Sequence, residues 1–290
     1  YIEIFTGLRR DYGYADINSA FKDPSTGKLK LKYGWAAKEL LDSDYIDHLE
    51  GKKSIGVQPC NDDGLSNFGA IDIDSDEYDN FDLRKYLEII DKKNIPVVPV
   101  KSKSGGLHIY VFFKEPVKAS FVRNFLDKLL FTFSLKASTE IFPKQTQLGT
   151  GSDGKFINGN FINLPYYNRN ERVGLNLDGT EFTFEQFLKV VEANKKTKEE
   201  IEEFATELMR LELTGGADEF ADGPVCLQRL SKSKLDDYRD RFIYNYMVFA
   251  KKKYPDNWEE KLLEGARNYI VYDNIWGDEK VKQKIKAYKK

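Results

Sequence analysis

One short segment, FGAIDIDSD at residues 68–76, constrains the fold of this chain more than any other. Its acids and isoleucines alternate, and successive side chains of a β-strand point to opposite faces. Asp72 and Asp74 therefore share one face of a strand, and the isoleucines beside them pack behind that face. Two neighbouring carboxylates repel each other, so the arrangement favours a bound cation. The same spacing also fits a strand that ends in an acidic surface loop, because further acids follow at positions 76, 77 and 79.

The composition sets limits on the kind of protein this is. The chain has 290 residues, of which 41% are apolar and 14% aromatic, enough for one large domain or a domain with an appendage. No apolar run approaches the ~18 residues of a membrane span, so we expect no membrane partner. Cys60 and Cys226 fit a reducing compartment and cannot form a zinc site alone. We expect a cytoplasmic protein, and an excerpt of a longer chain because the sequence does not begin with methionine.

Charge does not identify a partner. The net charge is −2 and the isoelectric point is about 5.9, so a uniformly basic surface for nucleic acid is excluded. Basic residues nevertheless gather at Lys251–Lys253 and in the last eleven positions, whereas residues 72–79 are strongly acidic. A phosphate-binding surface away from the acids is therefore compatible with the composition.

The order of predicted elements indicates the fold class. From residue 68 the pattern predicts a strand, a helix, two strands, a helix and a further strand, over residues 68–74, 83–94, 95–100, 107–113, 120–133 and 138–144. This is the order of a split βαβ, ferredoxin-like unit, the form that RRM domains also take. Further strands are predicted at residues 54–60 and 159–167. We therefore expect an α+β fold with an RRM-like core.

The second half of the chain is predicted to be helical. Residues 183–196 and 197–213 have helical patterns, and Thr197 opens the second with a capping box. Residues 214–224 are rich in turn formers and predict a linker, after which only helices follow. We expect an α/β domain at 1–190, a helical connector with a glycine-rich linker at 191–223, and an all-helical domain at 224–290.

The segment KSKSGGLHIYVFF, residues 101–113, suggests an anion site. Ser104, Gly105 and Gly106 predict a tight turn whose backbone amides approach an anion. His108 begins the strand that follows, and Lys103 precedes the turn, so both suit a phosphate contact. The alternative is a half-buried histidine that hydrogen bonds hold in place.

Two later segments add polar candidates. In STEIFPKQ, Glu140 precedes Lys144 and Gln145, and the alternative for this acid is a solvated strand edge. In NGNFINLPYYN, amides and aromatic rings flank a strand, where the rings either stack on bases or belong to the core and its rim. These residues are Asn160, Asn163, Tyr166 and Tyr167.

Taken in order, an Asp-x-Asp strand, a Ser-Gly-Gly-x-His strand and an acid before Phe-Pro-Lys-Gln resemble the archaeo-eukaryotic primase superfamily. The resemblance is closest to phage and plasmid primase-polymerases and to the primase domain of TOTE conflict systems, and it covers residues 48–168. It implies a template-directed nucleotidyltransferase on an RRM-like catalytic module. Asp72, Asp74 and Glu140 match the metal-binding acids of the family, and His108 matches its nucleotide-phosphate histidine.

The chemistry of nucleotide addition suits these residues. Joining a nucleotide to a 3′-hydroxyl uses two divalent ions roughly 3.5–4 Å apart, and carboxylates are typical ligands of Mg²⁺ and Mn²⁺. We therefore expect two such ions, with an NTP or dNTP, a primer and a single-stranded DNA template as partners. The expected nucleotide-binding residues are Lys103, Ser104, Gly105, Gly106, His108, Lys144, Gln145, Asn160 and Asn163. The resemblance also implies a role in phage or plasmid replication and a helicase beyond residue 290.

Other functions remain open on the residues alone. A two-metal nuclease would use the same acids, and an RRM-like binding module without catalysis would need none of them. A rolling-circle nickase is disfavoured because the two histidines, His48 and His108, cannot form a His-x-His cluster.

Basic residues outside the acidic strand are candidates for nucleic-acid contacts. Arg9 and Arg10 suit template phosphates, although paired arginines also occur on ordinary surfaces. We expect the helical domain either to support primer initiation or to tether a further domain. Its candidate contacts are Arg229, Arg239, Arg241 and Lys251–Lys253.

Overall fold

The structure is a computed structural model that describes residues 1–22, 29–78, 81–103, 105–151, 154, 157–213, 218–221 and 223–288. The chain divides into two compact units, Tyr1–Glu202 and Glu203–Lys290. In the described part of the chain, no helix has the length and apolar character needed to span a membrane.

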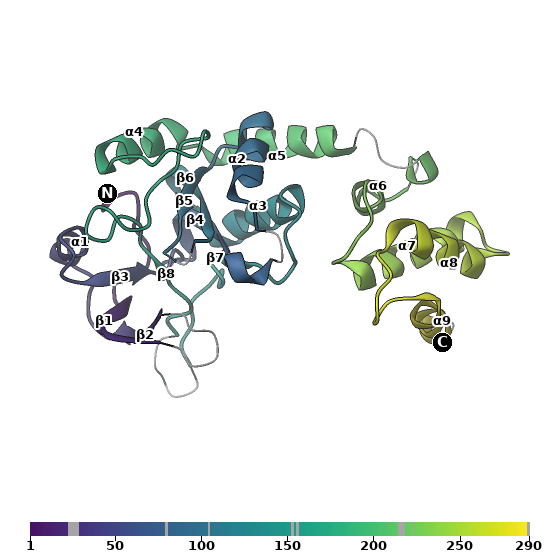
Figure 1. The fold of residues 1–290 in the computed structure, drawn as a ribbon, viewed down its shortest axis with the longest axis horizontal. Helices are drawn as coiled ribbons and strands as arrows, with labels where there is room; N and C mark the ends of the chain where they lie inside the picture. Colours follow the sequence, from purple (N-terminus) through teal and green to yellow (C-terminus); the bar gives the residue numbers. More distant parts are fainter. Residues whose placement is uncertain are drawn as a thin grey trace. The chain divides into compact units, whose positions relative to one another are not determined.

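The first unit contains the split βαβ arrangement predicted from the sequence (Figure 1). Its elements are β4 (Leu65–Ile73), α2 (Leu83–Lys92), β5 (Val98–Lys101), β6 (Leu107–Lys118), α3 (Ala119–Thr132) and β7 (Glu140–Phe142). The four strands form one antiparallel sheet in the order β5-β6-β4-β7. β4 is therefore a central strand, with β6 on one side and β7 on the other, which confirms the expected fold class.

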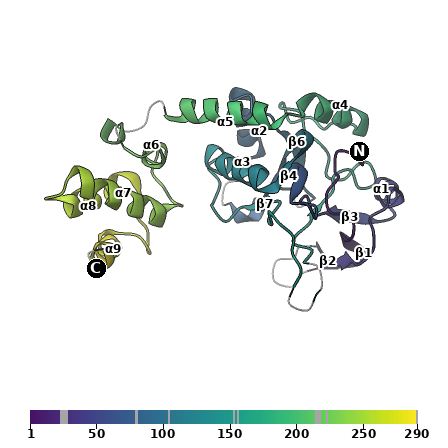
Figure 2. The same cartoon turned by 180° about the vertical axis from the view of Figure 1, so that it is seen from behind.

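The two faces of this sheet pack against different partners. Helix α3 covers one face so closely that a Cβ on Gly69 of β4 would lie 2.3 Å from Val122 (Figure 2). Helix α2 lies beside α3. The ring of Tyr86 on α2 contacts the ring of Phe133 at the end of α3, with 6.1 Å between the ring centres. The opposite face carries Phe68, whose buried ring packs edge-on against Phe5 near the N-terminus.

A second antiparallel sheet in the order β2-β1-β3-β8 completes this unit. Its strands are β1 (Tyr12–Lys22), β2 (Leu29–Ala36), β3 (Ser54–Val57) and β8 (Ile162–Asn163), and α1 (Asp42–Leu49) joins β2 to β3. The two sheets share one apolar core. Its members include Phe5, Tyr12, Ile55, Val57, Phe68, Ala70, Tyr110, Phe112, Ile162, Leu164 and Phe187.

The hairpin of β1 and β2 is not predicted by the sequence pattern. Gly13 and small polar residues interrupt the apolar alternation of β1, so no period of two is visible there. The hairpin instead depends on Phe161, whose ring fills the space over Gly13 and Gly56 and contacts Trp35 at 5.1 Å. This contact joins positions far apart in the sequence, which a local pattern does not reveal.

Helices α4 (Phe184–Asn194) and α5 (Lys198–Leu213) follow the strands. The capping box predicted at Thr197 is confirmed. Glu200 donates its backbone N–H to the Thr197 hydroxyl at 3.2 Å, and its carboxylate accepts the Thr197 N–H at 2.7 Å. These bonds satisfy N–H groups that have no partner within the helix itself.

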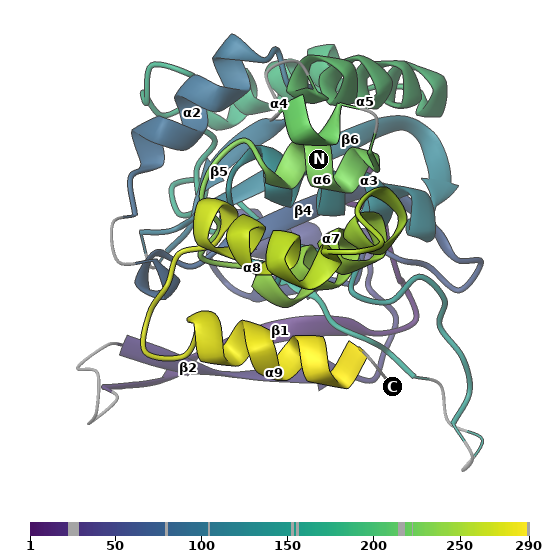
Figure 3. The ribbon, with the colours of Figure 1, turned by 90° about the vertical axis from the view of Figure 1, so that its right-hand side faces the viewer.

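The second unit is helical, as expected. After the short 3-10 turn η2 (Asp218–Phe220) it contains α6 (Val225–Leu230), α7 (Arg239–Lys253), α8 (Trp258–Tyr269) and α9 (Asp278–Tyr288). Helix α7 packs against α8, and α8 packs against α9 (Figure 3). The linker expected at 214–224 needs a correction, because Phe220 is fully buried among the rings of Phe242 and Tyr246. Gly215 and Gly216 lie outside the described residues.

Candidate active site on the central strands

Asp72 stands at the centre of the candidate site. Antiparallel register places it directly opposite His108 of β6 and directly opposite Glu140 of β7. Residues directly opposite each other in an antiparallel sheet point to the same face. The three side chains therefore form a row across three adjacent strands. Asp74 follows just after the end of β4, at the N-cap position of the short 3-10 turn Ser75–Glu77.

Asp72 and His108 are in direct contact. The distance from His108 Nε2 to Asp72 Oδ1 is 3.1 Å, and His108 is buried. Burial raises the pKa of the Asp72 carboxyl, but the charge and hydrogen bond of His108, together with the charge of Lys144, outweigh it. The pKa of Asp72 therefore lies below its ordinary value. The pair keeps Asp72 ionised despite its partial burial.

The orientation of the His108 ring follows from its neighbours. A carboxylate only accepts hydrogen bonds, so Nε2 of His108 carries a proton and donates it to Asp72. Nδ1 lies 3.4 Å from the Tyr110 hydroxyl on the same strand and accepts from it in the tautomer that carries its proton on Nε2. Burial, followed by the charge of Asp72, raises the pKa of Tyr110, so its hydroxyl stays protonated.

Glu140 has a basic partner of its own. The Lys144 ammonium forms an ion pair with the Glu140 carboxylate, and it lies 5.2 Å from the centre of the Phe142 ring. Lys144 also contributes to the lowered pKa of Asp72. Its positive charge therefore acts on two of the three candidate metal ligands.

Asp74 differs from the other two acids. Burial raises the pKa of its carboxyl, and the negative charges of Asp72, Asp76 and Glu77 raise it further. The site thus holds more negative charge than its own basic groups neutralise, and carboxylates are the ligands that Mg²⁺ and Mn²⁺ prefer. The donor set therefore fits divalent ions. Among the residues that the structure describes, however, no three acidic, histidine or cysteine side chains are already gathered around one point.

The turn between β5 and β6 lies against the end of β4. A Cβ on Gly106 would lie 2.2 Å from the Ile73 carbonyl oxygen, so only glycine fits there. Gly105 has a φ of +86° and donates its N–H to the Ser102 carbonyl at 3.2 Å. Ser104 lies outside the described residues. Lys103 Nζ lies 3.5 Å from a Glu171 carboxylate oxygen.

Comparison with known protein families identifies the domain that carries these residues. Residues 13–204 match the family described as the TOTE conflict system, Archaeo-Eukaryotic Primase domain. The chain belongs to this family. The match confirms the resemblance inferred from the sequence, and it includes Asp72, His108 and Glu140.

One solved structure similar to this primase domain is the AEP domain of the cyanophage S-2L primase-polymerase. Its sequence identity is 12%, its TM-score is 0.32, and the match covers 66% of this chain and 94% of that chain. No curated protein sequence matches the chain.

An amide network follows directly after Lys144 in the chain and includes two of the predicted nucleotide contacts. Gln145 Oε1 accepts from the backbone N–H of Asn160 at 2.9 Å, which fixes the orientation of the Gln145 amide. Gln145 Nε2 then donates to Asn160 Oδ1 at 2.8 Å, and Gln58 Nε2 donates to Gln145 Oε1 at 3.0 Å. Gln145 and Asn160, both predicted as nucleotide contacts, thus bond to each other. Gln58 was not predicted.

Gln58 and Arg123 are the residues that sequence reasoning missed. Gln58 is fully buried after β3, and its Oε1 has no protein partner among the described residues. Arg123 of α3 donates to the backbone carbonyls of Pro143 and Lys144 at 3.2 and 2.9 Å. A polar residue in the apolar context of SIGVQPC was the available signal for Gln58. Together the two residues hold the segment that carries Lys144.

Five predicted nucleic-acid or nucleotide contacts have other surroundings than expected. Tyr166 is fully buried and packs 4.8 Å from the Phe187 ring, so it is a core residue rather than a stacking surface. Arg10 donates to Asn158 at 2.6 Å and pairs with Asp62 at 3.0 Å, so it joins two loops.

The other three predicted contacts, Arg9, Tyr167 and Asn163, are more exposed than Tyr166. Arg9 pairs with Asp42 at 2.7 Å, Tyr167 donates to the Gly51 carbonyl, and Asn163 lies opposite Gly56 with a buried Oδ1.

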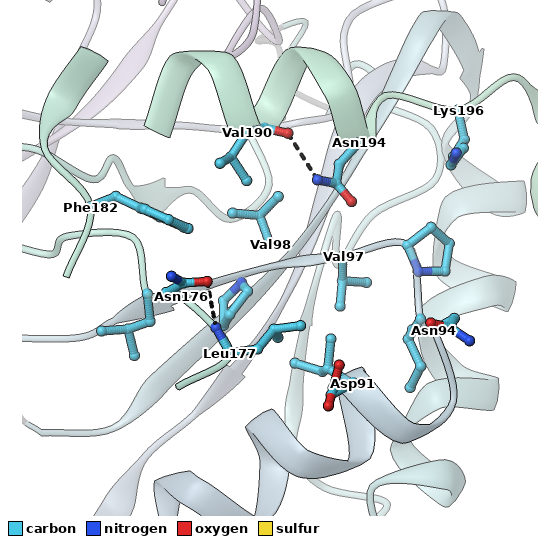
Figure 4. Close-up of a pocket in the computed structure, with 15 residues that line it drawn as sticks. Asp91, Asn94, Val97, Val98, Asn176, Leu177, Phe182, Val190, Asn194 and Lys196 are labelled. Atoms are coloured by element: carbon cyan, nitrogen blue, oxygen red, sulfur yellow. Dashed lines mark hydrogen bonds between the residues drawn. The ribbon is translucent and has the colours of Figure 1, made fainter. Parts of the chain in front are cut away.

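A cavity of about 420 Å³ lies elsewhere in the primase domain, along the β5 edge (Figure 4). It is bounded by the end of α2, by residues 175–177 and by α4. Asn176 Oδ1 accepts from the Leu177 N–H at 3.0 Å, and Asn194 Nδ2 donates to the Val190 carbonyl at 2.9 Å. None of the candidate catalytic residues lines this cavity, so it is separate from the acidic site.

Proposed function

We propose that this primase domain is a template-directed primase-polymerase. It transfers a nucleotide from an NTP or dNTP to a 3′-hydroxyl on a single-stranded DNA template, in phage or plasmid replication. One observation carries the proposal: Asp72 lies in register with His108 on one neighbouring strand and with Glu140 on the other. A rigid sheet thereby presents two carboxylates and a phosphate-binding type of side chain on one face.

The acids are proposed to hold two divalent ions. Bound to Asp72, Asp74 and Glu140, Mg²⁺ or Mn²⁺ would activate the 3′-hydroxyl and stabilise the leaving pyrophosphate. The excess negative charge around Asp74 supports this assignment. The sheet fixes the positions of two of these carboxylates, because strand pairing places Asp72 directly opposite Glu140.

Basic groups beside the acids favour synthesis over cleavage. His108 Nε2 carries a proton next to Asp72, and the Lys144 ammonium is beside Glu140. Both are hydrogen-bond donors that suit the phosphates of a bound NTP or dNTP. A nuclease binds no triphosphate and so needs no such donors. Lys103, beside the glycine turn, is proposed as a third contact. Arg9 and Tyr167 are proposed as template contacts.

The helical unit is proposed to support primer initiation, in which the first nucleotide has no primer to hold it. Several of its cations are already used within the unit: Arg239 pairs with Asp273 at 2.6 Å, and Lys251 donates to the Tyr288 carbonyl at 2.9 Å. Arg241 and Lys252 are exposed, by contrast. Their spacing on α7 places them on one helix face with two exposed apolar side chains, Tyr244 and Val248. An aromatic ring between basic groups suits a nucleotide or single-stranded DNA.

The test of the catalytic proposal is primer synthesis and primer extension on single-stranded DNA with Mn²⁺, run with NTPs and dNTPs separately. We expect incorporation by the wild-type protein and none by Asp72→Asn. Metal-dependent shortening of labelled DNA without nucleotides would indicate a nuclease instead. DNA binding that is indifferent to metal and to Asp72→Asn, without incorporation, would indicate a binding module.

The initiation proposal has a separate test. The double variant Arg241→Ala/Lys252→Ala should lose dinucleotide formation on an unprimed template and keep extension of an annealed primer. Lys282→Ala on α9, whose ammonium pairs with Glu279 at 2.8 Å, is the matched surface control. Equal loss of both activities, or loss of neither, would contradict the role in initiation.

A further inference from the structure

Two of the three candidate metal ligands are already bonded to basic side chains. His108 donates to Asp72 at 3.1 Å, and Lys144 pairs with Glu140. These are the same basic groups proposed to contact the triphosphate. A divalent ion and the two basic side chains therefore compete for the same carboxylate oxygens. This competition agrees with the finding that the described acids are not gathered around one point.

The backbone that carries Lys144 is held from two sides. Arg123 binds the carbonyl of Lys144 itself at 2.9 Å, and the next residue, Gln145, is bonded to Asn160 and Gln58. The side chain is less constrained, because it is 28% exposed and its ammonium sits at the end of a flexible four-carbon stem. The ammonium is thus free to change partner while its backbone stays in place.

We propose that Lys144 is an exchangeable counter-ion of the active site. Without metal, it neutralises Glu140; when a divalent ion binds the acids, Lys144 leaves Glu140 and its ammonium turns to the triphosphate. His108 exchanges at Asp72 in the same way, so its Nε2–H becomes available to a phosphate oxygen. The proposal rests on the proposed function and adds a form of regulation to it: metal binding prepares the nucleotide site.

The exchange has a measurable consequence. In the protein without nucleotide, a divalent ion has to separate Lys144 from Glu140, so the lysine weakens metal binding. Once the ion is bound, the released ammonium strengthens nucleotide binding. Metal and nucleotide are therefore coupled through the protein, and such coupling is reciprocal. Loss of Lys144 should move the two affinities in opposite directions, which a lysine with a purely structural role would not do.

The experiment measures Mn²⁺ binding by titration calorimetry, without nucleotide, in the wild type, Lys144→Gln and Lys103→Gln. We expect Lys144→Gln to bind Mn²⁺ roughly five-fold more tightly or better, the lower end of typical coupling. Lys103→Gln is the matched control, because its ammonium faces Glu171 at 3.5 Å and not the three acids. Its Mn²⁺ affinity should equal that of the wild type. Both variants should bind a non-hydrolysable dNTP analogue more weakly in Mg²⁺.

Lys144→Met keeps an unbranched apolar side chain of similar length at this position, and the melting temperature in EDTA shows whether each variant folds. Unchanged or weaker Mn²⁺ binding by folded Lys144→Gln and Lys144→Met overturns the exchange. The variant Asp72→Asn shows whether only the exchange is wrong or the proposed function is wrong as well. If Asp72→Asn loses Mn²⁺ binding while the lysine variants show no gain, only the exchange is wrong. If Asp72→Asn keeps both Mn²⁺ binding and DNA synthesis, both proposals are wrong.

Discussion

The imidazole of His108 and the carboxylate of Asp72 lie opposite each other on β6 and β4, with Nε2 3.1 Å from Oδ1. Burial opposes ionisation of Asp72, but this contact helps to hold the pKa of the carboxyl below its ordinary value. Asp74, two residues along, has the opposite shift, caused first by burial and then by neighbouring acids. The two acids of the Asp-x-Asp motif are therefore electrostatically different.

This difference predicts that two similar variants differ in their effect on stability. In EDTA at neutral pH, Asp74→Asn should raise the melting temperature. The raised pKa of Asp74 means that its ionised form is held less favourably in the folded than in the unfolded chain. Asp72→Asn should lower the melting temperature or leave it unchanged, because it removes a favourable partner of His108. Differential scanning calorimetry gives both values, and a lower melting temperature for Asp74→Asn would contradict the assignment.

His108→Ala should impair nucleotide use more than DNA binding. A hydrogen bond from an imidazole to a phosphate is worth roughly 1.5–3 kcal/mol when charge assists it, so the nucleotide KM should rise by roughly ten-fold or more. The affinity for single-stranded DNA should change little. Tyr110→Phe, which removes only the donor to Nδ1, should give a smaller rise in KM. Weaker DNA binding at an unchanged KM would show that His108 has a different role.

The amide network predicts an asymmetry between two glutamines. Gln145→Leu leaves the buried amide of Gln58 and the N–H of Asn160 without their acceptor, which should cost about 1–3 kcal/mol of the free energy of unfolding. Gln58→Leu should cost less, because Gln145 Oε1 keeps its bond from Asn160 and one buried unpaired acceptor disappears. Urea unfolding measures both values. A larger loss for Gln58→Leu would mean that Gln58, and not Gln145, is the centre of the network.

His48 predicts how stability depends on pH. Its ring accepts from the Ile55 N–H at Nδ1 and donates to the Pro165 carbonyl at Nε2, and burial followed by the charge of Arg172 lowers its pKa to about 4. The folded chain therefore resists protonation that the unfolded chain accepts near pH 6.5. Stability should be complete above about pH 6.5 and should fall by roughly 3 kcal/mol as the pH drops to about 4.

Urea unfolding of the wild type and of His48→Gln between pH 7.5 and 4.5 checks this linkage, with each protein compared with itself at the highest pH. The variant should lose less stability over this interval, because it lacks the group that titrates. Parallel losses in the two proteins would assign the acid sensitivity to carboxylates rather than to His48.

Local periodicity was sufficient to predict the split βαβ unit and to single out the acids of its central strand as candidate metal ligands. The alternation of acids and isoleucines in β4 and the helical spacing in α2 and α3 are visible over short windows, and the structure has these elements with only small shifts of their ends. The capping box at Thr197 is local in the same sense. Features that depend on neighbours within a few positions are accessible from the sequence because the backbone geometry of helices and strands is regular.

Only the tertiary structure decided which side chains meet. No local pattern states that Asp72 lies opposite both His108 and Glu140, since a shift of register by one residue would turn each strand's side chains to the other face. Nor does it reveal that Gly13 and Gly56 make room for Phe161. Tyr166 and Phe220 sit in segments rich in turn formers and polar residues, yet both are buried.

The physical reason is that burial and pairing are properties of contacts between distant parts of the chain. A sequence specifies which groups are available for chemistry, and here it specified the acids, the histidine and the lysines. Packing of one sheet against another determines which of those groups are exposed, which are buried, and which are bonded to one another. In this chain, packing buries Tyr166, bonds Arg10 to Asn158 and pairs Lys144 with Glu140.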